Sequence, residues 1–127
     1  MKDELHGTAI LIVSEEAIVA RFLAFAVEDR GGTIISFASS LTETIAKWDS
    51  GSLPAPAVAI LDVNDYSEEL KALLVRLVAG RVPVIVCAPA CFPVMAKQFP
   101  RIHVLIKPVS SEELYVSLLR LAPPTRP

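Results

Sequence analysis

The sequence predicts an α/β fold in which a five-stranded parallel sheet carries helices on both faces. Five short apolar runs alternate along the chain with about five amphipathic segments, and most connections between them are short. Hydrophobic residues make up 53% of the 127 residues and charged residues 20%, enough to build a substantial core. We expect one domain over residues 1–127, with its core at 7–121, a frayed proline-rich tail at 122–127 and no room for a separate output domain.

The first strand and helix are predicted near the N-terminus. Residues 9–13 (AILIV) are continuously apolar, which is typical of a parallel strand covered on both faces. Ser14 can cap the helix that follows, and Glu15 and Glu16 are favourable near a helix N-terminus. Apolar side chains then recur at helical spacing up to a glycine pair that ends the pattern: Ile18, Phe22 and Phe25, before Gly31 and Gly32.

The next segments repeat the strand and helix order. Residues 33–37 (TIISF) predict a second strand, and Ser40 with Glu43 has the spacing of a capping box at the start of a helix. A loop rich in turn-forming residues leads into residues 58–61 (VAIL), a third apolar strand. This strand ends abruptly at Asp62.

The second half of the chain continues the alternation. Ser67 opens a third helix that ends near Gly80 and carries a leucine stripe of Leu70, Leu73, Leu74 and Leu77. Residues 82–86 predict the fourth strand, after which two prolines permit only a short helix at about 93–99. Residues 103–106 predict the fifth strand. The spacing of Ser110 and Glu113 predicts the cap of the last helix.

Ligands of such sheets bind beyond the carboxyl ends of the strands. Four short segments therefore mark the candidate site: Ser14-Glu15-Glu16, Asp62-Val63-Asn64, Ala88-Pro89 and Lys107-Pro108.

In order and position these segments resemble the receiver domain of two-component response regulators, the CheY-like family, over about residues 7–121. Residues 60–64 (ILDVN) are similar to the phosphoacceptor segment of that family, residues 83–86 (PVIV) to its fourth strand, and residues 106–108 (IKP) to its lysine-proline element. The resemblance implies a flavodoxin-like, receiver-type fold. It also implies that Asp62 is the phosphoacceptor and that Lys107 pairs with the carboxylate and then with the phosphoryl group.

The resemblance further implies a Mg²⁺ site. Receivers hold the ion with an acidic pair after the first strand, the phosphoacceptor, and the backbone carbonyl two residues beyond it. The matching positions are Glu15, Asp62, the carbonyl of Asn64 and, weakly, Ser14. Because Ser14 replaces one carboxylate and Glu15 is one methylene longer than aspartate, we expect weakened Mg²⁺ binding.

Three positions depart from the family pattern and indicate a degenerate phosphoryl switch. Ala88 stands where receivers carry a hydroxyl residue, and Pro89 lacks the backbone N–H that usually donates next to it. Val104 stands where receivers usually carry an aromatic side chain on the fifth strand. The usual contacts that link the phosphoacceptor to the face formed by the fourth helix, the fifth strand and the last helix are therefore missing.

Two main functions follow. In the first, the chain is a stand-alone bacterial receiver in a phosphorelay, phosphorylated at Asp62 by a histidine kinase or phosphotransfer protein. In the second, it is a phosphorylation-independent interaction module that binds a target protein or a second copy through its fourth helix, fifth strand and last helix. A third alternative is a small phosphatase, but Asn64 stands where that class carries its second aspartate. We expect no enzymatic activity beyond self-phosphorylation and autodephosphorylation.

Charge and cysteine content favour a cytoplasmic protein without nucleic-acid or membrane partners. The formal net charge is −2, which offers nucleic-acid phosphates no basic footprint. The N-terminus has neither the positive charge nor the apolar length of a signal peptide. Cys87 and Cys91 form no disulfide framework or complete metal site, so we expect free thiols.

Overall fold

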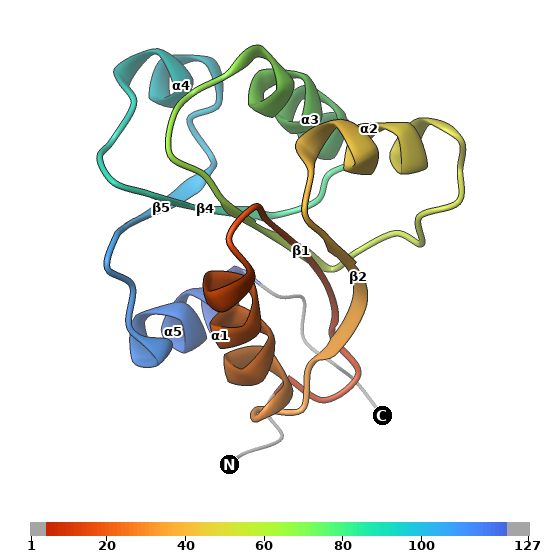
Figure 1. Cartoon of the computed structure of the whole chain (residues 1–127), viewed down its shortest axis with the longest axis vertical. Coiled ribbons are helices and arrows are strands. Elements are labelled where there is room, and N and C mark those ends of the chain that lie inside the picture. Colours follow the sequence, from red (N-terminus) through yellow and green to blue (C-terminus); the bar gives the residue numbers. More distant parts are fainter. Residues whose placement is uncertain (1–4, 122–127) are drawn as a thin grey trace.

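A central sheet of five parallel strands lies between two layers of helices in the computed structural model, which describes residues 5–121 (Figure 1). The strands are β1 (Ala9–Ser14), β2 (Thr33–Ala38), β3 (Val58–Asp62), β4 (Val84–Ala88) and β5 (His103–Ile106), in the spatial order β2-β1-β3-β4-β5. Helices α1 (Ala17–Glu28) and α5 (Ser111–Leu121) cover one face, whereas α2 (Leu41–Asp49), α3 (Glu68–Ala79) and α4 (Pro93–Gln98) cover the other. The predicted fold class is confirmed. The tail expected to fray, residues 122–127, lies outside the described residues.

The middle of the sheet forms the core. Strands β3 and β4 are buried along their whole length, as is β1 after its first residue, because helices cover both faces. The leucine stripe of α3 packs fully buried against one face, as its spacing predicts: Leu70, Leu73, Leu74 and Leu77. No helix in the described part of the chain is long and apolar enough to cross a membrane.

Three of the predicted helix caps are present. In each of them a serine hydroxyl accepts a hydrogen bond from a backbone N–H in the first turn, which satisfies a donor that the helix itself leaves free. The pairs are Ser40 with Glu43 (3.2 Å), Ser67 with Leu70 (3.1 Å) and Ser110 with Glu113 (3.0 Å). The last pair is reciprocal, because the Glu113 carboxylate accepts from the Ser110 N–H at 3.0 Å.

The prediction that Ser14 caps the first helix is wrong. Ser14 is the last residue of β1, and α1 begins at Ala17 with Glu16 at its N-cap and no side-chain cap. Glu15 and Glu16 therefore precede the helix. Strand pairing explains the difference, because Ser14 lies opposite Asp62 in the β1–β3 ladder and the chain turns only after it.

The apolar repeat correctly predicts that α1 is a helix, but the residues of this repeat do not lie on its buried side. Ile18, Phe22 and Phe25 are 84%, 38% and 71% exposed. The side packed on the sheet carries Ala20, Leu23 and Val27 instead.

The fourth strand also lies two residues later than predicted, at Val84–Ala88 instead of 82–86. Val82 still belongs to the turn after α3, because its N–H bonds to the Leu77 carbonyl at 2.9 Å.

Candidate functional site

Asp62 stands at the carboxyl end of β3, the central strand of the sheet. Its neighbours across the two ladders are Ser14 on β1 and Cys87 on β4. The side chain of Asp62 is only 3% exposed. A buried carboxylate needs charge compensation and hydrogen bonds to remain ionised, so the groups around it define the site.

Two side chains compensate the Asp62 carboxylate. The Nζ of Lys107, in the segment after β5, lies 2.7 Å from Oδ1, in an ion contact without the angles of a directed hydrogen bond. The Ser14 hydroxyl donates to Oδ2 at 2.8 Å. The parallel sheet brings these three residues together because the carboxyl ends of its strands meet at one edge.

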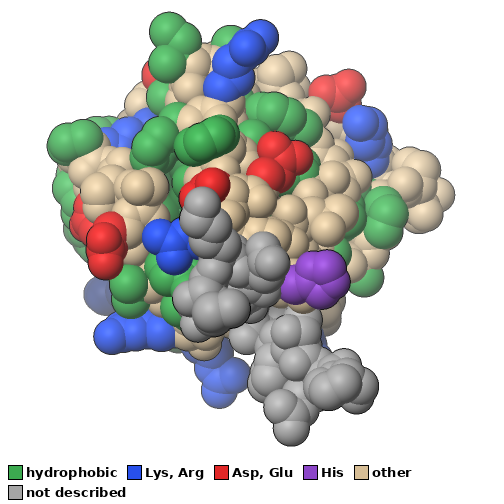
Figure 2. Space-filling model, turned by 90° about the horizontal axis from the view of Figure 1, so that it is seen from below, with side chains coloured by type: hydrophobic (Ala, Val, Ile, Leu, Met, Phe, Trp, Pro, Cys, Tyr) green, Lys and Arg blue, Asp and Glu red, His purple; other side chains and the backbone are tan. Residues whose placement is uncertain are grey.

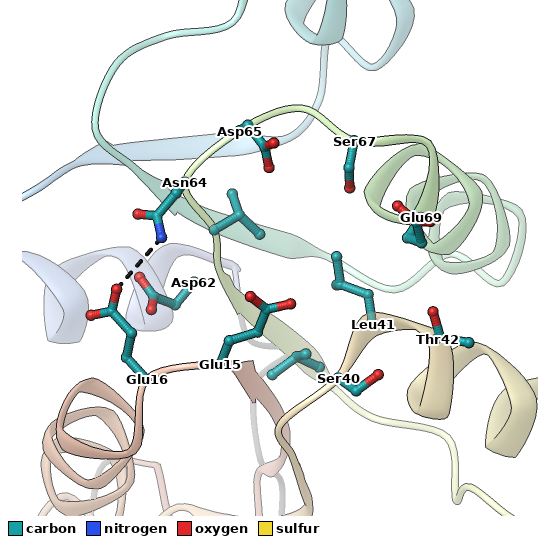
Figure 3. Close-up of a pocket in the computed structure, with 12 residues that line it drawn as sticks. Glu15, Glu16, Ser40, Leu41, Thr42, Asp62, Asn64, Asp65, Ser67 and Glu69 are labelled. Carbon is teal, nitrogen blue, oxygen red and sulfur yellow. Dashed lines mark hydrogen bonds between the residues drawn. The ribbon is translucent and has the colours of Figure 1, made fainter.

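Asn64 extends the network beyond Asp62. Its Oδ1 accepts from Lys107 Nζ at 3.1 Å, and its Nδ2 donates to Glu16 Oε2 at 3.5 Å, the bond drawn in Figure 3. Glu16 belongs to one of the segments that mark the candidate site in the sequence, but only Glu15 is assigned a ligand role there. The sequence places the two glutamates side by side and does not tell which of them turns toward Asn64.

An acidic cavity of about 350 Å³ opens beside Asp62. Figure 3 shows Glu15 and Glu16 reaching into it from the segment after β1, with Asp65 on the loop after β3 and Glu69 in the first turn of α3. The carboxylate oxygens that line this cavity are ligands of the kind that Mg²⁺ prefers, and this ion is commonly held by one or two carboxylates together with water. Within residues 5–121, however, no three His, Cys, Asp or Glu side chains converge as a ligand group. The donors therefore fit the ion in chemistry and not as a preformed cluster.

A second cavity, of about 570 Å³, reaches Asp62 and Lys107 from the other side. Its walls are largely apolar and come from α1 and the segment after β5: Ile18, Val19, Phe22, Leu23, Pro108 and Val109. Cys87 also lines this cavity. Burial, together with the negative charge of Asp62, raises the pKa of the Cys87 thiol to about 12, so the group stays protonated and unreactive.

Of the three positions expected to weaken the switch, Ala88 and Pro89 lie at the carboxyl end of β4, and Val104 lies within β5, opposite Val86. Ala88 is fully buried at the end of β4, and its carbonyl accepts the Lys107 N–H at 2.9 Å. Its methyl group supplies no hydroxyl donor. Pro89 follows it at the surface, and Val104 on β5 packs half-buried against the core.

The surface carries no strong bias of charge where it is visible from the side of α1 and α5. Figure 2 shows that face, where apolar side chains reach the surface among both acidic and basic ones.

No protein-family model matches the sequence, and no curated protein sequence matches it significantly. Solved structures do match. The signal receiver domain of a modulated diguanylate cyclase from Desulfovibrio desulfuricans G20 is 21% identical, with a TM-score of 0.74, over 89% of this chain and 91% of that chain. The Vibrio cholerae chemotaxis protein CheY4 is 21% identical, with a TM-score of 0.71, over 90% and 98%. The CheX–CheY–BeF3–Mg complex from Borrelia burgdorferi contributes a match of 16% identity and TM-score 0.75, over 91% and 89%.

These likenesses establish the class of fold. The chain has the flavodoxin-like, receiver-type fold of CheY-like response regulators, as the sequence predicted.

Proposed function

We propose that the chain is a receiver-like signalling domain of a two-component phosphorelay, with Asp62 as its phosphoacceptor. The observation that carries the proposal is the buried Asp62 carboxylate with the Lys107 ammonium 2.7 Å away, at the ligand-binding edge of a receiver-type sheet. A compact positive charge at this place balances the carboxylate before the reaction and the phosphoryl oxygens after it.

The proposed reaction is a phosphoryl transfer to the protein itself. A carboxylate oxygen of Asp62 attacks the phosphorus, the bond between phosphorus and the donor breaks, and its electron pair leaves with the donor group. The donor is a phosphohistidine of a histidine kinase or phosphotransfer protein. In this proposal the chain turns over no external substrate apart from its own phosphorylation and autodephosphorylation, and it acts in the cytoplasm.

Mg²⁺ belongs to the proposal as a weakly held ion. Its oxygen ligands are Asp62, Glu15, the backbone carbonyl of Asn64 and, least, the hydroxyl of Ser14. When bound, the ion neutralises charge on the transferring group. Weak binding is expected because the Ser14 hydroxyl already donates to Asp62.

The phosphorylated state is proposed to be weakly stabilised. Ala88 and Pro89 withhold two donors that would otherwise face the phosphoryl oxygens. A hydrogen bond to a charged group is worth about 1.5–3 kcal/mol, so their loss shortens the lifetime of the modified state.

Intact-mass spectrometry after incubation with acetyl phosphate and Mg²⁺ tests the proposal. We expect the mass of one phosphoryl group on the wild type and none on Asp62→Asn. No gain on the wild type, or an equal gain on both proteins, refutes Asp62 as the phosphoacceptor.

One observation favours a second candidate, a phosphorylation-independent interaction module. Exposed apolar side chains lie on α4, β5 and α5: Val94 (58% exposed), Ile106 (47%), Val116 (41%) and Leu119 (41%). Analytical ultracentrifugation of the wild type, Asp62→Asn and Ile106→Lys tests self-association through this face. This alternative predicts a dimer that Asp62→Asn preserves and Ile106→Lys dissociates, and a monomeric wild type excludes self-association.

A further inference from the structure

The loop after Asp62 holds an aromatic link to α4 that the proposed phosphoacceptor role does not use. Two residues beyond Asp62, the Asn64 side chain accepts from Lys107, whose Nζ also contacts Asp62. Two residues further on, Tyr66 lies at the end of the loop, directly before the N-cap residue of α3. A change of charge at Asp62 thus has a short covalent path to Tyr66.

Tyr66 contacts both ends of α4. Its ring stacks on Phe92, the N-cap residue of the helix, with ring centroids 6.4 Å apart and planes inclined by 19°. Its hydroxyl donates to Oε1 of Gln98, the last residue of the helix. Burial and the nearby carboxylate of Glu68 raise the pKa of Tyr66, so the phenol remains a hydrogen-bond donor at neutral pH.

The same aromatic pair joins the core under α4. Tyr66 and Phe92 pack half-buried against the cluster that includes Met95, which is fully buried on α4. Val104 packs on this cluster as well. The helix is only six residues long, and Tyr66 contacts residues at both of its ends, so a displacement of Tyr66 acts on the whole helix.

We propose that Tyr66 couples the charge state of Asp62 to the position of α4. The inference rests on the proposed function, because phosphorylation is the natural change of charge. A phosphoryl group on Asp62 attracts the N–H donors of Lys107 away from Asn64, and the loop from Asn64 to Tyr66 then shifts. The stacked ring and the hydroxyl of Tyr66 transmit this shift to Phe92 and Gln98. Differential contacts of this kind are what a conformational shift requires.

Hydrogen exchange of peptides covering residues 92–99 measures the coupling directly. Tyr66→Phe keeps the ring and removes the hydroxyl, so we expect these amides to exchange about fivefold faster, the effect of one neutral hydrogen bond. Tyr115→Phe, on α5, is the matched control, and it should leave α4 unchanged. Peptides from α3 show that each variant is folded.

Four proteins then form a cycle: wild type, Asp62→Asn, Tyr66→Ala and the double variant. We expect Asp62→Asn to change α4 exchange by about threefold with Tyr66 present and not at all with Tyr66→Ala, as for residues coupled through one network. An equal response in both backgrounds, or none with Tyr66 present, overturns the coupling.

Phosphorylation supplies a separate arm. Acetyl phosphate should change α4 exchange in the wild type and leave it unaltered in Tyr66→Ala, although both proteins gain the same mass. A persistent α4 response in Tyr66→Ala overturns the coupling. An absent mass gain refutes the phosphoacceptor role alone, and the Asp62→Asn cycle still decides the coupling.

Discussion

The ion pair between Asp62 and Lys107 should be visible as an energetic coupling in Lys107→Met. This variant keeps an unbranched side chain and removes the ammonium 2.7 Å from Asp62 Oδ1. The carboxylate, 3% exposed, is then left with the Ser14 hydroxyl as its hydrogen-bond donor. Removing one partner of a buried ion pair costs about 3–5 kcal/mol.

The lower end of that range applies here, because 22% of the Lys107 side chain remains exposed and water screens the pair. We expect a loss of about 3 kcal/mol in the free energy of unfolding at pH 7, which lowers Tm by about 12 °C at roughly 4 °C per kcal/mol for a domain of this size. In Asp62→Asn the buried charge is gone, and Lys107→Met should cost only about 1 kcal/mol, the value of its remaining hydrogen bond to Asn64.

Urea and thermal unfolding of the wild type, both single variants and the double variant give the coupling energy, expected near 2 kcal/mol. Lys97→Met, at an exposed lysine on α4, is the control and should change stability by less than about 0.5 kcal/mol. Equal losses from Lys107→Met in both backgrounds would show that the pair does not stabilise the fold.

Three further predictions concern the residues around the site. At pH 8, a Cys87 pKa of about 12 leaves roughly one thiol in ten thousand ionised. Iodoacetamide should therefore label the exposed Cys91 to completion before it labels Cys87, as measured by peptide mass spectrometry. Equal labelling rates of the two cysteines would contradict this. Ala88→Thr should prolong the lifetime of the phosphorylated state about tenfold by adding one charge-assisted donor. Ala88→Val, which has the shape of threonine without the hydroxyl, should not prolong it. Equal lifetimes of the two variants would refute the role of the donor. Ser14→Asp with Glu15→Asp should tighten Mg²⁺ binding about tenfold by calorimetry, and unchanged affinity places the ion elsewhere.

The order of strands and helices and the edge that carries the site could be predicted from the sequence. Continuous apolar runs mark strands covered on both faces, and serine caps mark helix starts, because both signals are local. Asp62 and Lys107 are far apart in sequence, yet Asp62 ends one strand of the parallel sheet and Lys107 follows another. The fold class alone therefore places both residues at the same edge of the sheet.

The tertiary structure decided which side of each element faces which neighbour. Helix α1 carries apolar residues on two sides, and only its position on the sheet selects Leu23 over Phe25 for burial. Ser14 reads locally as a cap, but its pairing opposite Asp62 turns the hydroxyl to the carboxylate.

The contacts of Glu16 and Tyr66 depend on the path of a loop. Tyr66 lies in the loop before α3, and Gln98 ends α4, 32 residues later in the chain. No spacing in the sequence therefore indicates their hydrogen bond. Periodicity and caps report interactions within one turn or strand. Contacts between loop side chains depend instead on how all the elements between them pack, and this packing is set only in the folded chain.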